Sequence, residues 1–307
     1  TYADLPAGTE LARASGFVTI QRGCDRFCAY CIVPLVRGRE RAVPPETVLR
    51  QVGEQLAAGR REVTLLGQTV NSYRHGETDF PTLLRQVARQ PGLARLRFLS
   101  PYPAGFGEEL CALFASEPGL MPQVHLPLQS GSTAVLARMG RQYSREEYLA
   151  LVHRLRTACP GIALSTDVLV GFPGESEEQL EQTVALLEQV RFQSAYLYRY
   201  SERPGTRAAH RFPDDVPEEE KLRRLQRVID VQEGITREIL DGWCGKEVEV
   251  LVDGPSRRDR QAASGRSREN IPVVVTAAGA VRPGELLAAS VVRSTGHTLL
   301  AEPVRHG

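Results

Sequence analysis

The sequence predicts an α/β fold, an open partial barrel of six parallel strands, followed by a small all-β domain. Six short β-rich runs alternate with longer amphipathic stretches before Gly242, and after it the pattern changes to short alternating runs separated by Gly and Pro. Parallel strands need crossover connections, which are usually helices. Six units are fewer than the eight of a closed (β/α)8 barrel, so the barrel is expected to stay open.

The individual elements follow from periodicity and from end signals. The predicted strands lie at 17 to 20, 62 to 66, 95 to 99, 123 to 127, 162 to 170 and 194 to 200. The predicted helices lie at 45 to 58, 80 to 90, 106 to 116, 144 to 158, 176 to 190 and 217 to 241. Ser144 stands three residues before Glu147, as in a capping box. Functional side chains are expected at the carboxyl ends of the strands.

The same pattern divides the chain into three parts. Residues 1 to 15 show no clear periodicity and are expected to be a linker or entry segment. Residues 16 to 241 are expected to form the partial barrel, and 242 to 307 the β domain. A compact all-β module of this size resembles a small barrel or sandwich.

Composition excludes several classes of protein. The 307 residues are 42% apolar and 24% charged with a formal net charge of +1, so the chain is neither disordered in character nor an overall polycation. Any nucleic-acid contact must come from a local basic patch. No apolar run approaches the roughly 20 residues of a membrane span, and nothing resembles a signal peptide. We therefore expect a cytoplasmic protein without membrane contact.

Three of the six cysteines are bunched in the stretch CDRFCAYC, directly after the first predicted strand. Cys24, Cys28 and Cys31 have the spacing at which one loop can wrap a [4Fe-4S] cluster, and three ligands leave one iron open. The alternatives are a zinc site, which normally has four ligands, and three unrelated buried cysteines. A reducing compartment suits clustered thiols of either kind.

Further candidate residues follow the predicted strands. Polar side chains at or just beyond strand ends, which suit ribose hydroxyls or an amino-acid group, are Ser100, Gln129 and Asp167. In the sequence GFPGE, Gly171 and Phe172 open a helix where backbone can approach a flat adenine, the alternative being an ordinary turn. Tyr30 is expected to shelter the cluster or to contact the edge of the adenine, the alternative being simple packing in the protein interior.

Arginines form two groups that suit a carboxylate or RNA phosphate. Arg37, Arg39 and Arg141 are expected near the mouth of the barrel, although a single surface arginine is often only solvated. In the tail, a loop containing Gly and Ser concentrates arginines suited to an RNA backbone. Its candidate ligands are Arg257, Arg258, Arg266 and Arg268. The alternative for this loop is a flexible charged hairpin tip.

The cysteine triplet with an aromatic before its third member resembles the signature of radical S-adenosylmethionine enzymes. The stretches RGCDRFCAYCIVPLVRGRER, LLGQTVNSY, HLPLQSGS, STDVLVGFPGES and YSERPGT resemble the methylthiotransferase branch of that superfamily over almost the whole chain. The closing β module resembles a TRAM domain, a small RNA-binding barrel. Within the branch, Gln68, Asn71 and the tail look most like the enzymes that act on N6-isopentenyladenosine beside the tRNA anticodon.

The resemblance implies a radical mechanism and a set of partners. A reduced cluster would cleave S-adenosylmethionine to a radical that removes hydrogen from the base, a sulfur species would add there, and a second S-adenosylmethionine would supply methyl. Gly67 and Gln68 would contact the methionyl group, and Asn71 would serve the substrate. The implied partners are a tRNA anticodon stem-loop, an electron donor such as flavodoxin or ferredoxin, and a sulfur source.

Members of the branch ordinarily carry an N-terminal domain with a second [4Fe-4S] cluster, which this sequence does not show. We therefore expect a fragment or a shortened relative that cleaves S-adenosylmethionine without completing sulfur insertion. Two alternatives stay open. One is a methylthiotransferase for threonylcarbamoyl-adenosine in tRNA or for a ribosomal protein aspartate. The other is a non-catalytic iron-sulfur or zinc RNA-binding protein.

Overall fold

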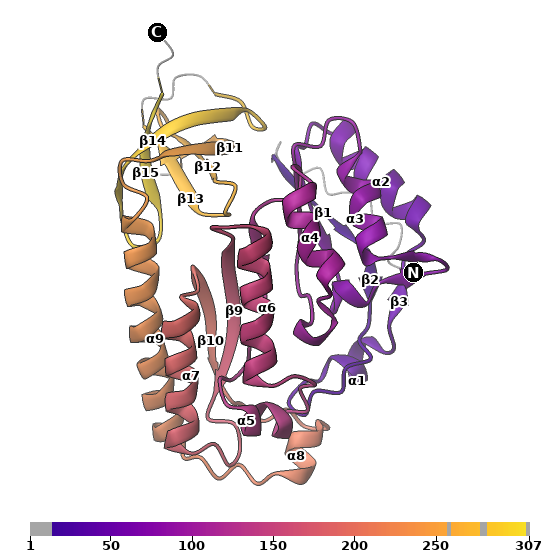
Figure 1. Ribbon diagram of the computed structural model, residues 1–307, viewed down its shortest axis with the longest axis vertical. Coiled ribbons are helices and arrows are strands. Elements are labelled where there is room, and N and C mark those ends of the chain that lie inside the picture. Colours follow the sequence, from indigo (N-terminus) through magenta and orange to yellow (C-terminus); the bar gives the residue numbers. More distant parts are fainter. Residues whose placement is uncertain (1–13, 257–258, 277–280, 305–307) are drawn as a thin grey trace.

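The computed structural model describes residues 14–256, 259–276 and 281–304. Figure 1 shows two groups of parallel strands with helices on their outer side and a small β-barrel at one end. The strands of the larger part are β1 Ser15–Thr19, β4 Glu62–Leu66, β7 Arg95–Phe98, β8 Gln123–His125, β9 Ala163–Val170 and β10 Ser194–Arg199. Its longer helices are α2 Pro45–Ala57, α3 Phe80–Ala88, α4 Glu108–Ser116, α6 Arg145–Ala158, α7 Glu177–Val190 and α9 Glu218–Asp241.

The six strands form a partial barrel in two halves. One half has the parallel order β1-β4-β7, the other β8-β9-β10, and a parallel bridge between Leu96 and Leu120 joins them. Among the described residues β1 and β10 each pair with only one strand, so the barrel stays open between them. The predicted fold class is therefore confirmed, because each predicted strand forms and all six are parallel.

Short elements between the strands are absent from the prediction. They are β2 Gln21–Arg22, α1 Val33–Arg37, β3 Arg41–Ala42, the 3-10 turns Val70–Ser72 and Pro103–Gly105, β5 Arg74–His75, β6 Thr78–Asp79, α5 Thr133–Arg138 and α8 Arg207–Arg211. Each is at most six residues long. Periodicity cannot detect such elements, since it needs a window of about 11 or more residues.

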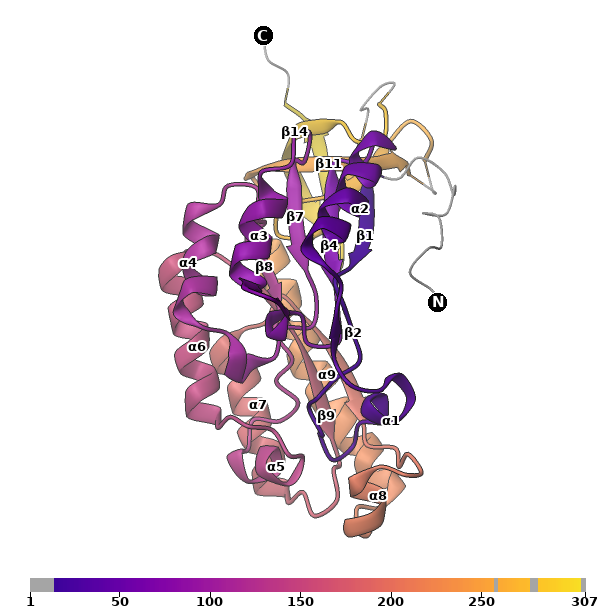
Figure 2. The same ribbon diagram turned by 90° about the vertical axis from the view of Figure 1, so that its right-hand side faces the viewer.

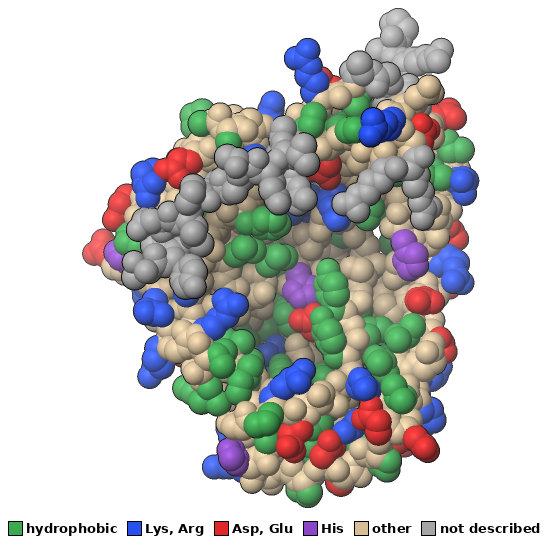
Figure 3. All heavy atoms as spheres, turned by 180° about the vertical axis from the view of Figure 1, so that it is seen from behind, with side chains coloured by type: hydrophobic (Ala, Val, Ile, Leu, Met, Phe, Trp, Pro, Cys, Tyr) green, Lys and Arg blue, Asp and Glu red, His purple; other side chains and the backbone are tan. Residues whose placement is uncertain are grey.

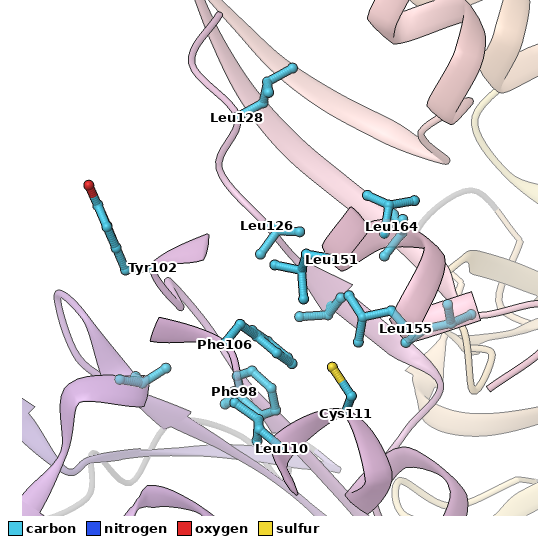
Figure 4. Packing of buried hydrophobic residues seen from close by; sticks show 14 of the residues in the cluster. Phe98, Tyr102, Phe106, Leu110, Cys111, Leu126, Leu128, Leu151, Leu155 and Leu164 are labelled. Carbon is cyan, nitrogen blue, oxygen red and sulfur yellow. The ribbon is translucent and has the colours of Figure 1, made fainter. Parts of the chain in front are cut away.

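The core lies between the strands and the helices that cover them (Figure 2). In Figure 4, Phe98 and Phe106 face the side chains of Leu151 and Leu155, which come from α6. The rings of Phe80 and Phe98 meet edge to face with centroids 5.2 Å apart. Capping boxes at Ser144 and Ser176 fix the starts of α6 and α7, as expected for Ser144. This packing holds the strand ends in fixed positions.

After α9 the chain forms a closed five-stranded barrel, which we call the terminal barrel. Its strands are β11 Glu247–Pro255, β12 Ala263–Arg266, β13 Pro272–Val275, β14 Leu286–Ser294 and β15 Leu299–Pro303, in the order β11-β12-β13-β15-β14. Alternate residues such as Val248, Val250 and Val252 point into its own apolar core. The predicted all-β module is thus present.

The terminal barrel packs on the amino ends of the parallel strands through buried arginines. Arg95 at the start of β7 is 1% exposed, and it donates to the backbone oxygens of Arg266 and Ser267 at 2.8 and 3.1 Å. It also pairs with the Glu249 carboxylate at 2.9 Å. Arg97 donates to the Ser267 oxygen at 3.1 Å. The carboxyl ends of the strands therefore lie at the opposite end of the molecule (Figure 1).

In the part of the chain that the structure describes, no helix combines the length and the apolar character that crossing a bilayer requires.

Candidate active site

The three clustered cysteines lie in one long loop, residues 23 to 40, which we call the cluster loop. Its ends are joined because β2 and β3 pair antiparallel, with Arg22 opposite Arg41. We call this pair of strands the neck of the loop. Next to it, the Cys24 N–H donates to the Gly38 oxygen at 3.1 Å. The Asp25 carboxylate accepts from the Arg39 guanidinium at 2.5 and 3.0 Å, and that hydrogen bond lowers the pKa of Asp25. The loop is thus shaped by its own backbone and charges.

Replacing Gly23 with alanine is expected to open this neck. Gly23 has φ +78°, and a Cβ there would overlap the Arg39 carbonyl, whereas Gly38, at φ +74°, has open space around it. Gly38→Ala should cost about 2 to 3 kcal/mol from the backbone alone, because φ +74° with ψ −162° is a region that essentially only glycine adopts. Gly23→Ala should cost about 2 kcal/mol more because the overlap must be relieved. Urea unfolding of both variants measures the difference, and equal costs would show that the neck is loose.

The cysteine side chains face inward to different extents. Cys24 and Cys28 are buried, and Cys31 is half-buried. The Cys24 sulfur lies 3.3 Å from the Thr69 hydroxyl, and the Cys31 N–H donates to the Cys28 oxygen at 3.1 Å. Burial raises the pKa of Cys31, and the neighbouring Cys28 and Cys24 thiols raise it further. The three thiols therefore lie near enough to influence one another's charge.

Arg141 lies beneath the cluster loop. Its guanidinium approaches the Cys28 sulfur at 3.6 Å and donates to the Tyr143 hydroxyl at 2.8 Å and the Pro127 oxygen at 3.1 Å. It also stacks over the Tyr102 ring at 4.6 Å. The expectation that this side chain meets RNA phosphate is not supported by these contacts, since every one of them is internal. A fixed positive charge here would offset thiolate charge on the loop.

The donor set suits an iron-sulfur cluster better than a single ion. Among the described residues no three His, Cys, Asp or Glu side chains converge as a ready-made site for one metal ion. A cubane cluster does not require such convergence, because each thiolate binds a different iron atom. Three thiols on one loop with the half-buried Arg141 cation beside them fit that group. We therefore expect Cys24, Cys28 and Cys31 to hold it.

Polar groups with unusual features gather at the carboxyl ends of the strands. Gly67 and Gln68 follow β4, and the Gln68 amide oxygen is buried without a hydrogen-bond partner in the described part of the chain. Such an acceptor costs free energy unless a ligand donates to it. Ser100 after β7 and Gln129 after β8 have φ of +60° and +72°, a strained region often found at functional sites. These four predicted residues share one edge of the barrel.

Three predicted cofactor contacts lie deeper. Phe172 is fully buried against the rings of Tyr200 and Phe212, so its side chain does not face an open site. Tyr30 packs against the same apolar group, and burial raises its pKa. The Gly171 N–H donates to the buried Glu175 carboxylate at 2.6 Å. The contacts of Phe172 and Tyr30 are those of packing, and the contact of Gly171 is that of an ordinary strand-to-helix turn.

The predicted substrate contacts near the cluster loop are mostly used internally. The Asn71 side chain donates to the Tyr102 oxygen at 2.8 Å and accepts from its N–H at 2.7 Å, so the amide holds the chain after β7. Arg39 pairs with Asp25, and Arg37 is exposed at the end of α1. Unlike the Arg39 guanidinium, the Arg37 guanidinium makes no hydrogen bond or ion pair within the described part of the chain.

The predicted basic loop of the tail is described only in part. Arg257 and Arg258 lie outside the described residues. Arg266 and Arg268 are exposed in and after β12, and Arg266 donates to the Asn270 backbone and side-chain oxygens at 3.2 Å. They flank the turn that meets the amino ends of β7 and β10.

A cavity of about 320 Å³ opens between the two halves of the barrel. Figure 3 shows a hollow on this face with histidine and acidic side chains inside it. The lining includes the predicted Ser100 and Asp167, together with His125, Tyr196, Tyr198 and Asn270. These last four are not among the site residues predicted from the sequence. The signal that would reveal the tyrosines is their alternation in SAYLYRY, which puts both on one strand face.

An open six-stranded parallel barrel with a three-cysteine loop at its mouth defines a radical S-adenosylmethionine protein. The Radical SAM superfamily model matches residues 18–187. A radical S-adenosylmethionine methyltransferase from Kitasatospora setae has the same fold, with TM-score 0.55 and 22% identity over 64% of this chain and 39% of that one. Coproporphyrinogen III oxidase from Escherichia coli matches with TM-score 0.55 and 14% identity over 73% and 53%.

Curated relatives show which family within this superfamily the chain resembles. A protein of Chlorobium limicola is 46% identical over 93% of this chain and 65% of its own length, and one of Prosthecochloris aestuarii is 44% identical over 98% and 68%. Both are named tRNA-2-methylthio-N(6)-dimethylallyladenosine synthase. The chain belongs to the tRNA-2-methylthio-N(6)-dimethylallyladenosine synthase family. It spans about 65% of the length of the first of these relatives.

Proposed function

We propose that the chain provides the radical-generating and RNA-binding parts of an enzyme that adds a methylthio group to N6-isopentenyladenosine beside the tRNA anticodon. The single observation that carries this is the identity of more than 40% with such synthases over nearly the whole chain. The loop of Cys24, Cys28 and Cys31 suits the cluster that a radical S-adenosylmethionine enzyme needs. We place the protein in the cytoplasm with its tRNA substrate.

The bound cluster and S-adenosylmethionine would together supply a carbon-centred radical able to remove an unactivated hydrogen. The chain's own residues would hold the reactants. Thr69 and Arg141 contact the sulfurs of Cys24 and Cys28 and would fix the loop. The unpaired amide oxygen of Gln68 would accept from the amino group of the cofactor. An electron donor such as flavodoxin or ferredoxin would reduce the cluster, and a separate source would supply the sulfur.

Binding of RNA would involve the terminal barrel. Arg266 and Arg268 are exposed there, and phosphate contacts of this kind give affinity that falls as salt rises. Their turn is fixed to the larger domain by Arg95. RNA held by the terminal barrel would therefore have a defined position relative to the open side of the parallel barrel.

Anaerobic reconstitution tests this function. We expect about four irons per chain and release of 5'-deoxyadenosine when the protein is reduced in the presence of S-adenosylmethionine. One zinc per chain with no cleavage would instead support the non-catalytic RNA-binding alternative. The identity of the base is tested by mass spectrometry of tRNA nucleosides from cells that lack the gene. Loss of a methylthio group from threonylcarbamoyl-adenosine alone would contradict the proposed substrate.

A further inference from the structure

The cluster loop exposes a group of apolar side chains to solvent. Phe27, Leu35 and Val36 are 59%, 62% and 67% exposed. They are three of the nine large apolar side chains that are exposed in the described part of the chain, although the loop has only 18 residues. Single exposed apolar side chains are ordinary on a protein surface, whereas a group of them marks an interaction site.

The short helix α8 and the turn before it extend this surface. The Ala208 N–H in α8 donates to the Ala29 oxygen of the cluster loop at 2.7 Å. The Leu35 side chain lies next to Gly205, just before α8. Figures 1 and 2 show α1 and α8 close together at the end of the molecule opposite the terminal barrel. We call the exposed side of residues 23 to 40 and 201 to 213 the outer face.

The outer face carries an excess of positive charge. Its two segments contain six arginines and three carboxylates, while the whole chain has a formal net charge of only +1. Arg207 lies over Gly140, beside the Phe27 backbone, so that charge adjoins the apolar group. The exposed guanidiniums that make no hydrogen bond or ion pair within the described residues are those of Arg37, Arg203, Arg207 and Arg211. Like charges gathered in this way attract a partner of opposite charge.

The position of the outer face indicates what such a partner does. Phe27 directly precedes Cys28, and α1, which contains Leu35 and Val36, begins two residues after Cys31. A protein that touches Phe27 is therefore one residue away from a cluster ligand. Electron tunnelling slows steeply with distance, so this is a favourable place for an electron to enter. Complexes of electron-transfer proteins are small and weak, with an apolar core and a polar rim, and the outer face has that composition.

RNA is the other anionic partner that these arginines could meet. The terminal barrel, which is proposed to bind RNA, lies at the far end of α9, whose 24 residues span about 36 Å. Proteins hold single-stranded RNA largely by stacking its bases on aromatic rings. Two of the three exposed apolar side chains on the outer face, Leu35 and Val36, are aliphatic. The outer face therefore fits a protein partner better than RNA.

We infer that the outer face is the docking surface for an acidic one-electron carrier protein, with Leu35 and Val36 as its apolar contacts and Arg203 and Arg211 as its charged ones. The inference rests on the proposed function and adds the surface through which the enzyme is reduced. One electron passes from the reduced carrier, which becomes oxidised, to the cluster, and no atom or proton moves with it. The charge of the outer face raises the rate of encounter and makes that rate fall as salt rises.

Two reductants separate docking from chemistry. The protein probe is a reduced flavodoxin with an acidic surface, and the small reductant is dithionite at saturating concentration. The double variant Arg203→Glu, Arg211→Glu should lower kcat/KM for flavodoxin in S-adenosylmethionine cleavage about 10-fold or more, because steering is reversed. Cleavage driven by dithionite should not change. Fluorescence anisotropy of labelled flavodoxin, measured on the protein before reconstitution, gives its affinity without any activity. Val36→Ser should weaken that affinity about 3- to 10-fold.

Arg89→Glu and Val292→Ser are the matched controls. Arg89 is exposed at the end of α3, Val292 on β14 is 56% exposed, and both lie outside the outer face. Neither control should change flavodoxin binding or cleavage. Unchanged flavodoxin binding and kcat/KM in the double variant would overturn the inference. So would a double variant that loses affinity for an anticodon stem-loop RNA and keeps its rate with flavodoxin, since the outer face would then bind RNA. Absence of cleavage by the unaltered protein with dithionite would instead overturn the proposed function.

Discussion

Replacing Cys28 with alanine is expected to abolish iron incorporation and the release of 5'-deoxyadenosine. A cluster held by three thiolates loses a third of its protein ligands in this variant, and the loop has no fourth cysteine to replace it. The Arg141 guanidinium, 3.6 Å from the Cys28 sulfur, would also face an empty position. The half-buried guanidinium would keep its hydrogen bonds to Tyr143 and Pro127, so the lost ligand is the main effect.

Iron content and 5'-deoxyadenosine release measure this effect after anaerobic reconstitution. Cys244→Ala is the control, because Cys244 is exposed after α9 and far along the chain from the cluster loop. It should keep full iron content and activity. Far-ultraviolet circular dichroism of both variants checks that the fold survives. Cleavage retained by Cys28→Ala would contradict the assignment of the cluster ligands.

The fold could be predicted because it depends on long, repeated patterns. Runs such as 62 to 66 and 163 to 170 are continuous and β-rich, and the helices between them are amphipathic over about two and a half to four turns. The four short strands of the cluster-loop neck (β2 and β3) and of the β5-β6 hairpin depend on shorter signals. The neck of β2 and β3, two residues each, depends on pairing across 18 residues of loop, which no local pattern carries.

The candidate site could be predicted only where the spacing of residues along the chain is itself characteristic of the chemistry. The triplet of Cys24, Cys28 and Cys31 is such a case. Asn71 and Arg141 were assigned to the substrate, yet they contact Tyr102 and Cys28 inside the protein, because an amide or a guanidinium serves a buried backbone as well as a ligand. Conversely, Tyr196 lies in the cavity because two sheet halves and the terminal barrel meet there, which depends on tertiary packing.

A second large effect is expected at the buried pair of Arg97 and Glu62. Their side chains are 4% and 5% exposed and meet at 2.9 Å. Burial lowers the pKa of Arg97, which the Glu62 carboxylate partly reverses. Arg97→Met should lower the free energy of unfolding by about 3 to 5 kcal/mol, because it leaves the buried Glu62 charge without its ion-pair partner and with only the Ser15 hydroxyl as a donor. Urea unfolding at neutral pH measures this loss.

A double variant separates the lost partner from the lost packing. Arg97→Met combined with Glu62→Leu removes both charges and should recover most of the stability. The exposed pair of Arg85 and Glu109, at 2.8 Å, is the control, and Arg85→Met should cost about 1 kcal/mol or less. Because Arg97 also donates to Ser267, the single variant should loosen the terminal barrel, which hydrogen exchange in β12 would detect. A cost no greater than the control's would show that the pair is hydrated and does not fix the two domains.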